Sequence, residues 1–320
     1  MHNQKLAKRA IGPGGPEVPV FSLGSWNTWD RMQPGEAVLM IERAAEAGAA
    51  FFDVAYYNMG PHQEHSRTDI LFGEAIRAAG LARTDFQVCG KLWLWNYPDL
   101  DFRAQIETSL ERAGLDRFDM VVAGDYLGRP DMARIADEVD LLIKDGLVGC
   151  WGINNWLIGD TLATLDHCAA RGIQPPIFAQ LKYGIVRRTV AEGKGYGALF
   201  SSGRLGLQAS DCMEGGLLIH KGPPRRKIGA DVGKIREQME GAADRLKQIA
   251  DGLGATPAQV AIAFCLANPA TTNVLFGASR LGQLEENLAA AALAAERGAE
   301  IRALCEPLWL DAHVSPDGGF

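Results

Sequence analysis

The chain has 320 residues, of which 47% are hydrophobic and 22% are charged, enough to bury the core of a large α/β domain. Its net charge of −7 and pI near 5.5 argue against nucleic acid as the main partner, which would normally require a basic face. Residues 1–5 lack the apolar core of a signal peptide and no apolar run approaches a membrane span, so we expect a cytoplasmic protein without a membrane partner. Six scattered cysteines without a C-x-x-C pair are expected to be reduced and mostly buried, and no metal site is predicted.

Strand and helix patterns alternate along the chain. Short apolar runs predict strands, and apolar residues at helical spacing followed by a glycine, as at Gly48, predict helices and their ends. Thr256 and Pro257 with Gln259 predict a further helix start, because Thr caps the first turn and Gln reaches back to it. Strands are expected at 19–24, 51–53, 86–92, 120–123, 148–153, 176–181, 206–210 and 272–277. Helices are expected at 34–47, 68–79, 101–113, 132–145, 159–171, 234–253, 281–291 and 296–309.

This alternation runs from end to end without a break in composition. It favours one (β/α)8 barrel over residues 1–320, with a long polar loop around 211–233. In such a barrel the carboxyl ends of the strands surround one mouth, where catalytic residues lie. The residues expected at that mouth are Trp26, Asp53, Lys91, Gly124, Asn154, Gln180, Ser210 and Gly277.

Six stretches in order carry a resemblance. They read LGSW at 23–26, AGAAFFDVA at 47–55, SLERAGLD with FD at 109–119, LVGCWGINNW at 147–156, GGLL at 215–218 and GASR with QLEEN at 277–287. In this order the chain resembles an aldo-keto reductase over nearly its whole length. The resemblance implies hydride transfer between a nicotinamide cofactor, usually NADPH, and a carbonyl or alcohol. It also implies a C-terminal tail that folds over the barrel mouth and the substrate.

The resemblance implies a catalytic set of Asp, Tyr, Lys and His. Asp53 and Lys91 match the first and third of these. A tyrosine that donates a proton needs a pKa below its usual value of about 10, and a neighbouring ammonium lowers it by favouring the phenolate. The family's Tyr position holds Asn58, so Tyr57 is the predicted acid. Asp53 also suits a turn cap or a structural ion pair with Lys91, and these roles stay open.

The family's fourth-strand His is absent as well. Gly124 stands there with Asp125 next, and Asp125 is predicted as a catalytic helper because a hydrophobic wall raises a carboxyl pKa. A solvated turn is the alternative role for this Asp. His62, His65 and His313 are weaker candidates, since each suits a surface or packing position equally well.

The resemblance also implies a cofactor site. Gly277 allows close backbone approach, and the following helix N-terminus favours an anion. Ser279 and Arg280 are expected at the adenosine 2′-phosphate, so NADPH is the predicted cofactor. The remaining residues predicted to bind it are Gln283, Glu286 and Asn287 near the adenine, Asn154, Asn155 and Gln180 at the carboxamide, and Ser25, Trp26 and Ser210. A plain polar helix face is the alternative for 283–287.

One further departure concerns the seventh strand. Ala209 stands where the family often has an aromatic residue that stacks on the nicotinamide. Trp26, Trp93, Trp95 and Tyr183 are candidates to line the pocket instead, and Glu214 is a candidate substrate contact.

These patterns predict an NADP-dependent oxidoreductase acting on a small polar or sugar-like carbonyl or alcohol. Two alternatives stay open: a non-redox lyase, dehydratase or epimerase on the same barrel, and a catalytically silent NADPH-binding regulatory protein. The expected partner is a small-molecule substrate, and a homo-oligomer is compatible with the sequence.

Overall fold

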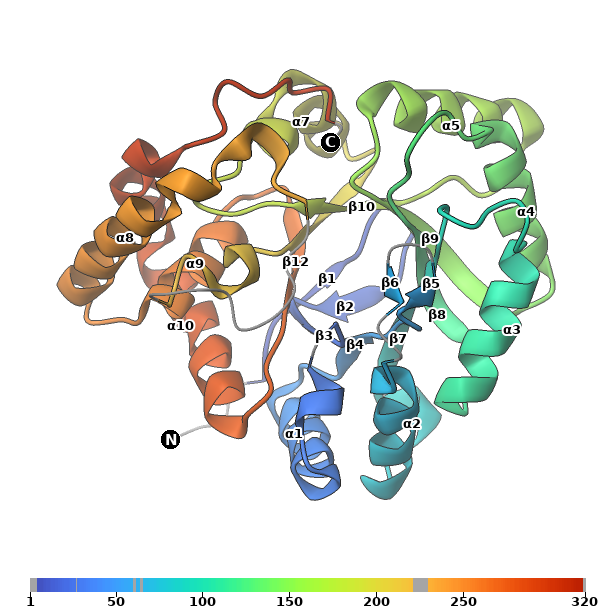
Figure 1. The fold of residues 1–320 in the computed structure, drawn as a ribbon, viewed down its shortest axis with the longest axis horizontal. Coiled ribbons are helices and arrows are strands. Elements are labelled where there is room, and N and C mark those ends of the chain that lie inside the picture. Colours follow the sequence, from blue (N-terminus) through green and yellow to red (C-terminus); the bar gives the residue numbers. More distant parts are fainter. Residues whose placement is uncertain (1–4, 27, 60–61, 64–65, 221–229, 319–320) are drawn as a thin grey trace.

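A computed structural model describes residues 5–26, 28–59, 62–63, 66–220 and 230–318. Eight parallel strands close into a barrel in the order β10-β11-β12-β3-β4-β7-β8-β9, and helices surround it (Figure 1). The prediction of a (β/α)8 barrel is therefore confirmed. The barrel strands are β3 (Phe21–Gly24), β4 (Phe51–Asp53), β7 (Gln87–Leu92), β8 (Phe118–Ala123), β9 (Val148–Asn154), β10 (Phe178–Lys182), β11 (Gly206–Ser210) and β12 (Thr271–Phe276).

Side-chain caps determine where several of the helices begin. The Asp101 and Asp131 side chains accept hydrogen bonds from Ala104 N and Arg134 N, which caps two helix starts. The capping box predicted at Thr256 is present. The helices are α1 (Pro34–Ala47), α2 (Thr68–Ala78), α3 (Phe102–Ala113), α4 (Met132–Lys144), α5 (Ile158–Arg171), α6 (Thr189–Glu192), α7 (Lys194–Ser201), α8 (Met239–Leu253), α9 (Pro257–Leu266) and α10 (Leu281–Leu304).

Several parts of the fold differ from the prediction. Two short antiparallel strands, β5 (Asn58–Met59) and β6 (His62–Gln63), follow β4 where no strand was expected. A hairpin of β1 (Lys8–Ala10) and β2 (Glu17–Pro19) precedes the barrel, so the first barrel strand begins only at Phe21. Helices α6 and α7 were not expected between β10 and β11. The two helices expected at 281–291 and 296–309 form one element, α10, that is kinked at Arg297 and ends at Leu304.

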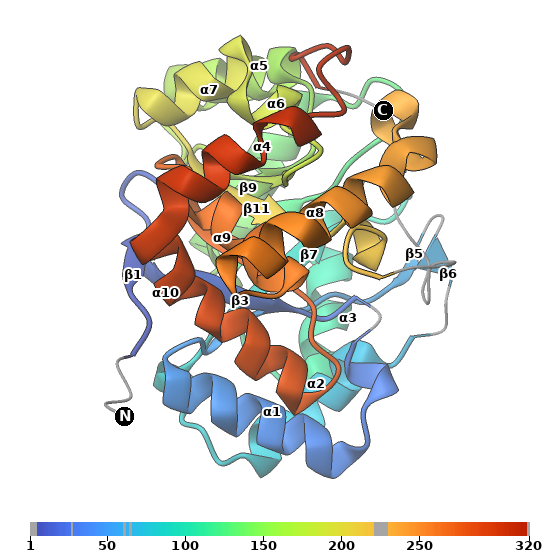
Figure 2. The same cartoon turned by 90° about the vertical axis from the view of Figure 1, so that its left-hand side faces the viewer.

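Helix α10 lies alongside α1 (Figure 2). Arg43 on α1 and Glu285 on α10 form an ion pair between them, with Nη2 and Oε2 3.1 Å apart. The two helices follow the eighth and first strands of the barrel. Their contact therefore closes the helical ring where the two ends of the strand sequence meet.

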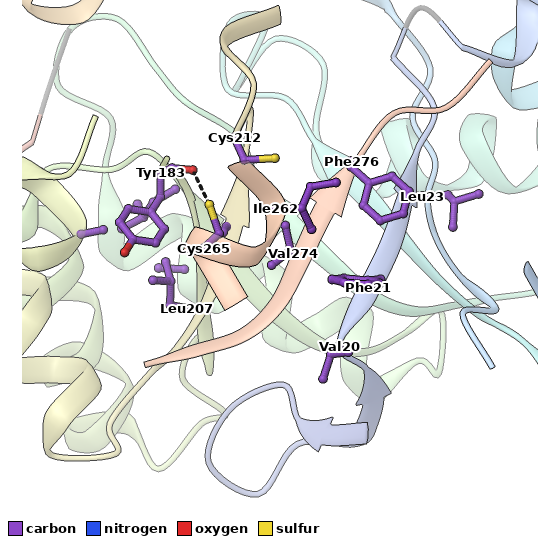
Figure 3. Close-up of a cluster of buried hydrophobic side chains, with 14 of the residues drawn as sticks. Val20, Phe21, Leu23, Tyr183, Leu207, Cys212, Ile262, Cys265, Val274 and Phe276 are labelled. Atoms are coloured by element: carbon purple, nitrogen blue, oxygen red, sulfur yellow. Dashed lines mark hydrogen bonds between the residues drawn. The ribbon is translucent and has the colours of Figure 1, made fainter. Parts of the chain in front are cut away.

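Apolar side chains fill the space between the strands and the outer helices. Close to α9, they include Val20, Phe21, Leu23, Leu207, Ile262, Val274 and Phe276 (Figure 3). Cys265 lies in the same cluster and its Sγ donates a hydrogen bond to Tyr183 O at 3.4 Å. All six cysteines are free and buried, as the sequence predicted. This packing makes the strand ends a rigid platform.

The C-terminal tail packs on loops at the mouth of the barrel. Asp311 is buried and accepts hydrogen bonds from Arg188 N at 2.9 Å and from Thr189 N at 3.2 Å. Further along, Ile158 N donates to Asp317 O at 2.8 Å. The tail therefore joins the loops that follow β9 and β10.

Within the part of the chain that the structure describes, no single helix has the length and apolar character to cross a membrane. One pair of helical segments, Val232–Leu253 and Pro257–Leu266, meets the criterion jointly, with a bend of 87° between its members.

Candidate active site

A cavity of about 620 Å³ opens at the carboxyl ends of the strands. Its size lies within the range of pockets that hold small molecules and cofactors. Every barrel strand, or the residue or two after it, contributes to the wall: Gly24, Asp53, Lys91, Asp125, Asn154, Gln180, Ser210 and Phe276. The cavity therefore occupies the position where (β/α)8 enzymes carry out their chemistry.

An ion pair lies in the wall of this cavity. Lys91 Nζ is 2.9 Å from Asp53 Oδ2, and the two side chains expose only 9% and 2% of their surface. Gln180 joins both partners: its Oε1 accepts from Lys91 Nζ at 2.9 Å and its Nε2 donates to Asp53 Oδ2 at 2.9 Å. A buried ion pair persists only with such additional hydrogen bonds, because both charges have lost their water. The Asp53 carboxylate is thus committed to the interior of the barrel.

Tyr57 belongs to an aromatic wall of the same cavity. Its ring is stacked at 6.3 Å from that of Trp26 and lies 5.7 Å from that of Trp93, which in turn stacks on Trp95 at 4.9 Å. Trp93 is fixed from behind, because Gln105 accepts from its N at 2.7 Å and donates to its O at 2.9 Å. Tyr57 is 4% exposed and, like Lys91, lines the cavity. That it donates the proton stays a prediction.

Asp125 reaches the cavity from the loop after β8. Burial raises the pKa of its carboxyl, while the nearby ammonium groups of Lys182 and Lys91 act in the opposite direction. The preceding residue is held in place, because Trp156 Nε1 donates to Gly124 O at 2.7 Å. A carboxyl with a raised pKa is suited to proton transfer, so the predicted helper role remains a hypothesis that the surroundings favour.

Lys182 lines the cavity and was missed in the sequence. Its Nζ donates to Ala230 O at 2.8 Å and lies 3.8 Å from Asp211 Oδ2. The signal was its spacing from Gln180, since residues two apart on a strand face the same side. Lys182 thus adds to the cations of this cavity, which Lys91, Arg31 and Arg280 also line.

The predicted cofactor residues fall into two groups. Those that line the cavity are Trp26, Asn154, Asn155, Gln180, Ser210, Gly277, Ser279, Arg280 and Gln283. Among the described residues that form the wall, Ser25, Glu286 and Asn287 do not occur. The Ser25 hydroxyl is buried and accepts from Ala55 N at 3.3 Å, and Asn287 is buried in α10. None of these assignments is tested directly, and all stay predictions.

The turn that leads into α10 is shaped by close contacts. A Cβ on Gly277 would lie 3.1 Å from Thr28 Cγ2, so a side chain there would crowd the wall. Gln283 Oε1 accepts from Ser279 N at 3.0 Å, which fixes the first turn of the helix. Arg31 and Glu36 also line the cavity and were not singled out in the sequence.

Two other groups of predicted residues have different outcomes. Glu214 binds Arg187, whose Nε and Nη2 donate to its two carboxylate oxygens at 2.9 and 3.0 Å, and it is not among the described residues that line the cavity. Burial raises the pKa of Glu214, which Arg187 opposes. His65 and the side chain of His62 lie outside the described part of the chain. His313 is exposed, with Nε2 2.9 Å from Gly233 O.

The buried lysine–aspartate pair at the barrel mouth, and the glycine turn that opens a helix beside it, are the arrangement that the resemblance to aldo-keto reductases implied. Residues 21–306 match the model of the Aldo/keto reductase family, and the chain belongs to this family. Membership supports oxidoreductase chemistry at the level of the family.

The chain also aligns with several known proteins over most of their length. The chain is 28% identical to a probable voltage-gated potassium channel subunit beta of Arabidopsis thaliana, and 29% identical to one of Oryza sativa subsp. japonica. Both alignments cover 88% of this chain and 89% of the relative. A putative voltage-gated potassium channel subunit beta of Schizosaccharomyces pombe is 28% identical, with 88% of this chain and 87% of the relative covered.

Proposed function

We propose that this protein is an NADP-dependent oxidoreductase that interconverts a small polar or sugar-like carbonyl compound and its alcohol. The observation that carries the proposal is the buried Lys91–Asp53 pair, with Nζ and Oδ2 2.9 Å apart, in a cavity that Tyr57 also lines. Family membership supports the redox chemistry.

The residues present fit a nicotinamide dinucleotide. Gly277 lines the cavity without a side chain, so its backbone is open to a close approach, and a Cβ there would crowd Thr28 at 3.1 Å. Ser279 and Arg280 precede the N-terminus of the 24-residue helix α10, where backbone N–H groups and the helix dipole favour a phosphate. Asn154, Asn155 and Ser210 would hold the nicotinamide end. When bound, the cofactor supplies or accepts the hydride.

The protein's own side chains would handle the proton. In the reducing direction Tyr57 would give its hydroxyl proton to the substrate oxygen as that oxygen gains negative charge. The Lys91 ammonium would favour the resulting phenolate, and Asp53 would keep the ammonium in place. Asp125, the pKa of whose carboxyl is raised by burial, would be the second group to donate there.

The shape of the cavity supports a polar substrate with one apolar face. Four aromatic rings, of Trp26, Tyr57, Trp93 and Trp95, contribute to its wall. Asp125, Asn155 and Lys182 offer charged and amide groups in the same cavity. Aromatic faces stack on the C–H face of a sugar ring while polar groups bind its hydroxyls, so this combination favours a sugar-like compound.

A second function is favoured by the names of the relatives, which are those of channel subunits. In this function the chain would bind NADPH, turn over no carbonyl, and act as a regulatory subunit of another protein. The site would then report the redox state of the bound nucleotide.

To distinguish these functions, the protein is first titrated with NADPH while the fluorescence of the nucleotide is measured. A panel of aldehydes, ketones and sugars is then added, and the absorbance of the nicotinamide is recorded. Binding with oxidation supports the reductase, and binding without oxidation or product supports the regulatory subunit. Product formed without net NADPH loss would indicate a non-redox lyase, dehydratase or epimerase. An absence of binding would overturn all uses of the nucleotide.

A further inference from the structure

A continuous chain of buried amides runs inside the barrel, away from the Lys91–Asp53 pair. Gln180 Nε2 donates to Gln208 Oε1 at 2.7 Å, and Gln208 Nε2 donates to Asn273 Oδ1 at 2.9 Å. Asn273 Nδ2 then donates to Pro19 O at 2.8 Å, where the chain leaves the hairpin for the first barrel strand. The three amides stand side by side on β10, β11 and β12, since Gln180 pairs in register with Gln208 and Gln208 with Asn273.

These amides have no access to water. Gln208 and Asn273 are 0% exposed and Gln180 is 2% exposed. Ser22 on β3 is buried too, and its Oγ donates to Asn273 Oδ1 at 2.7 Å. These amides are hydrogen-bonded, yet they have lost their hydration, and apolar residues could fill this space at a lower desolvation cost. The position of the amides therefore calls for a reason other than packing.

The groups at the two ends of this series of amides allow each amide only one orientation. The Pro19 carbonyl is an acceptor, so Asn273 must turn its NH₂ toward it and its oxygen toward Gln208. Gln208 must then give its NH₂ to Asn273 and its oxygen to Gln180. The Lys91 ammonium at the other end is a donor only, and it meets the oxygen of Gln180. A flip of any one amide would oppose two acceptors or two donors.

Gln180 receives this orientation at the site. Its NH₂ donates to Asp53 and Gln208, and its oxygen accepts from Lys91 and from Asn154 Nδ2 at 2.9 Å. The amide therefore uses both N–H groups and both lone pairs within the protein. With Gln180 fixed in this way, two N–H donors of Lys91 point at Gln180 and Asp53, which sets the position of its charge in the cavity.

We propose that Gln208 and Asn273 are positioning residues, which act through Gln180 to hold Lys91 and Asp53 in their working arrangement. The proposal rests on the proposed oxidoreductase function for its effect on turnover. The arrangement of Gln180 itself can be measured without turnover. If the amides had a purely structural role, their removal would lower the stability of the protein but would change neither the orientation of Gln180 nor the rate of the chemical step.

The test compares Gln208→Met, which removes the amide at similar volume, with Gln208→Glu, which sets a carboxylate oxygen against Asn273 Oδ1. Thr161→Val is the matched control, because Thr161 is buried and its Oγ1 is 2.8 Å from Tyr196 Oη, outside the amide chain. Hydrogen exchange of the Gln180 side-chain NH₂ is followed by NMR on protein labelled with ¹⁵N-glutamine. NADPH affinity, kcat, KM and Tm are measured on the same samples.

In the wild type the Gln180 NH₂ should exchange slowly. Gln208→Met should raise the exchange rate about tenfold and lower kcat about tenfold, while NADPH affinity stays within about twofold of the wild type. Gln208→Glu should change the exchange rate and kcat by more than Gln208→Met does. Thr161→Val should lower Tm without changing exchange or kcat. Slow exchange and wild-type kcat in Gln208→Met would overturn the proposal. If the wild type turns over no carbonyl, the proposed function fails, and the exchange rate alone decides the positioning role. Should Gln208→Met not fold, Ser22→Ala, which removes one donor to Asn273, repeats the test with an expected change of about twofold.

Discussion

Lys91 on β7 and Asp53 on β4 lie on neighbouring strands of the barrel, and their charged groups meet 2.9 Å apart in the wall of the cavity. Removing one partner leaves the other buried and unpaired, so the pair acts as a unit. Asp53→Asn or Lys91→Met should reduce kcat by about a hundredfold or more with little change in NADPH affinity.

Lys247→Met is the control for this pair, since Lys247 and Asp251 form an ion pair on α8 in which both side chains are about 60% exposed. It should leave activity unchanged. Steady-state kinetics and nucleotide titration of the three variants check the prediction. Normal turnover in both Asp53→Asn and Lys91→Met would remove the pair from the mechanism.

Asp125 should impose a pH dependence. Burial raises the pKa of its carboxyl, so the protonated donor is lost as pH rises through that raised pKa, and kcat for reduction should fall over the same interval. Asp125→Asn cannot ionise, and the variant should lack this fall. Profiles of kcat recorded upward from about pH 4, near the ordinary pKa of an aspartate, to about pH 8 test it, and the prediction is wrong if the two profiles have the same shape.

The same shift has a consequence for stability. Because the folded state holds the Asp125 proton more tightly than the unfolded state, the carboxyl favours folding at low pH, and that contribution is lost as pH rises through the raised pKa. Asp125→Asn should therefore raise Tm relative to the wild type at about pH 8, by more than at about pH 4, near the ordinary pKa of an aspartate. Calorimetry at the two pH values measures the difference.

Arg280 should set the preference between cofactors. A guanidinium at the start of α10 gains a charge-assisted hydrogen bond only when a 2′-phosphate is present. Arg280→Met should weaken NADPH binding by about tenfold and leave NADH binding nearly unchanged. Arg245→Met, an exposed arginine on α8, is the control. Equal losses for both nucleotides would place the phosphate elsewhere.

The cysteines should be unreactive in the folded protein. All six are buried, and burial raises the pKa of Cys305 and of Cys168 to about 11 and that of Cys150 to about 12, so the reactive thiolate is disfavoured. A chromogenic disulfide reagent should label the native protein slowly and the denatured protein fully. Rapid labelling of a native thiol would contradict the burial.

Arg188 anchors the C-terminal tail. Its side chain is 0% exposed, donates from Nε to Ile185 O at 2.9 Å and from Nη1 to Glu306 Oε2 at 2.7 Å, and its guanidinium lies over the rings of Phe264 and Trp309. Arg188→Met should lower the free energy of unfolding by about 1–3 kcal/mol, because the buried carbonyl of Ile185 loses its donor. Arg134→Met, at an exposed pair on α4, should change it by less than about 0.5 kcal/mol. Urea denaturation compares them.

Most of the barrel could be predicted from sequence patterns that have a local physical cause. The strand ending at Asp53 and the helix capped by Thr256 could be predicted because alternation, caps and glycine stops act locally. Helix α7 could not, because Gly195 and Gly197 weaken its intrinsic helicity and its position depends on contact with α5, where a Cβ on Gly195 would be 2.7 Å from Ile158.

The site divides in the same way. Asp53 and Lys91 could be predicted because strand ends meet at one mouth. The aromatic wall around Tyr57 depends on the path of a loop, which sequence periodicity does not describe. Gln208 and Asn273 were missed because an amide inside an apolar strand signals nothing until its neighbours on adjacent strands are known.

In barrels of this kind, residues at the amino-terminal face are usually taken to serve stability and those at the opposite face to serve chemistry. Here the Pro19 carbonyl lies where the β1–β2 hairpin meets the first barrel strand, and it is joined by hydrogen bonds to Asn273, Gln208 and Gln180. The hairpin therefore belongs to the architecture of the mouth as well as of the base. A redesign that shortens or replaces the hairpin is therefore expected to change the positions of Lys91 and Asp53, even if the loops at the mouth are left untouched.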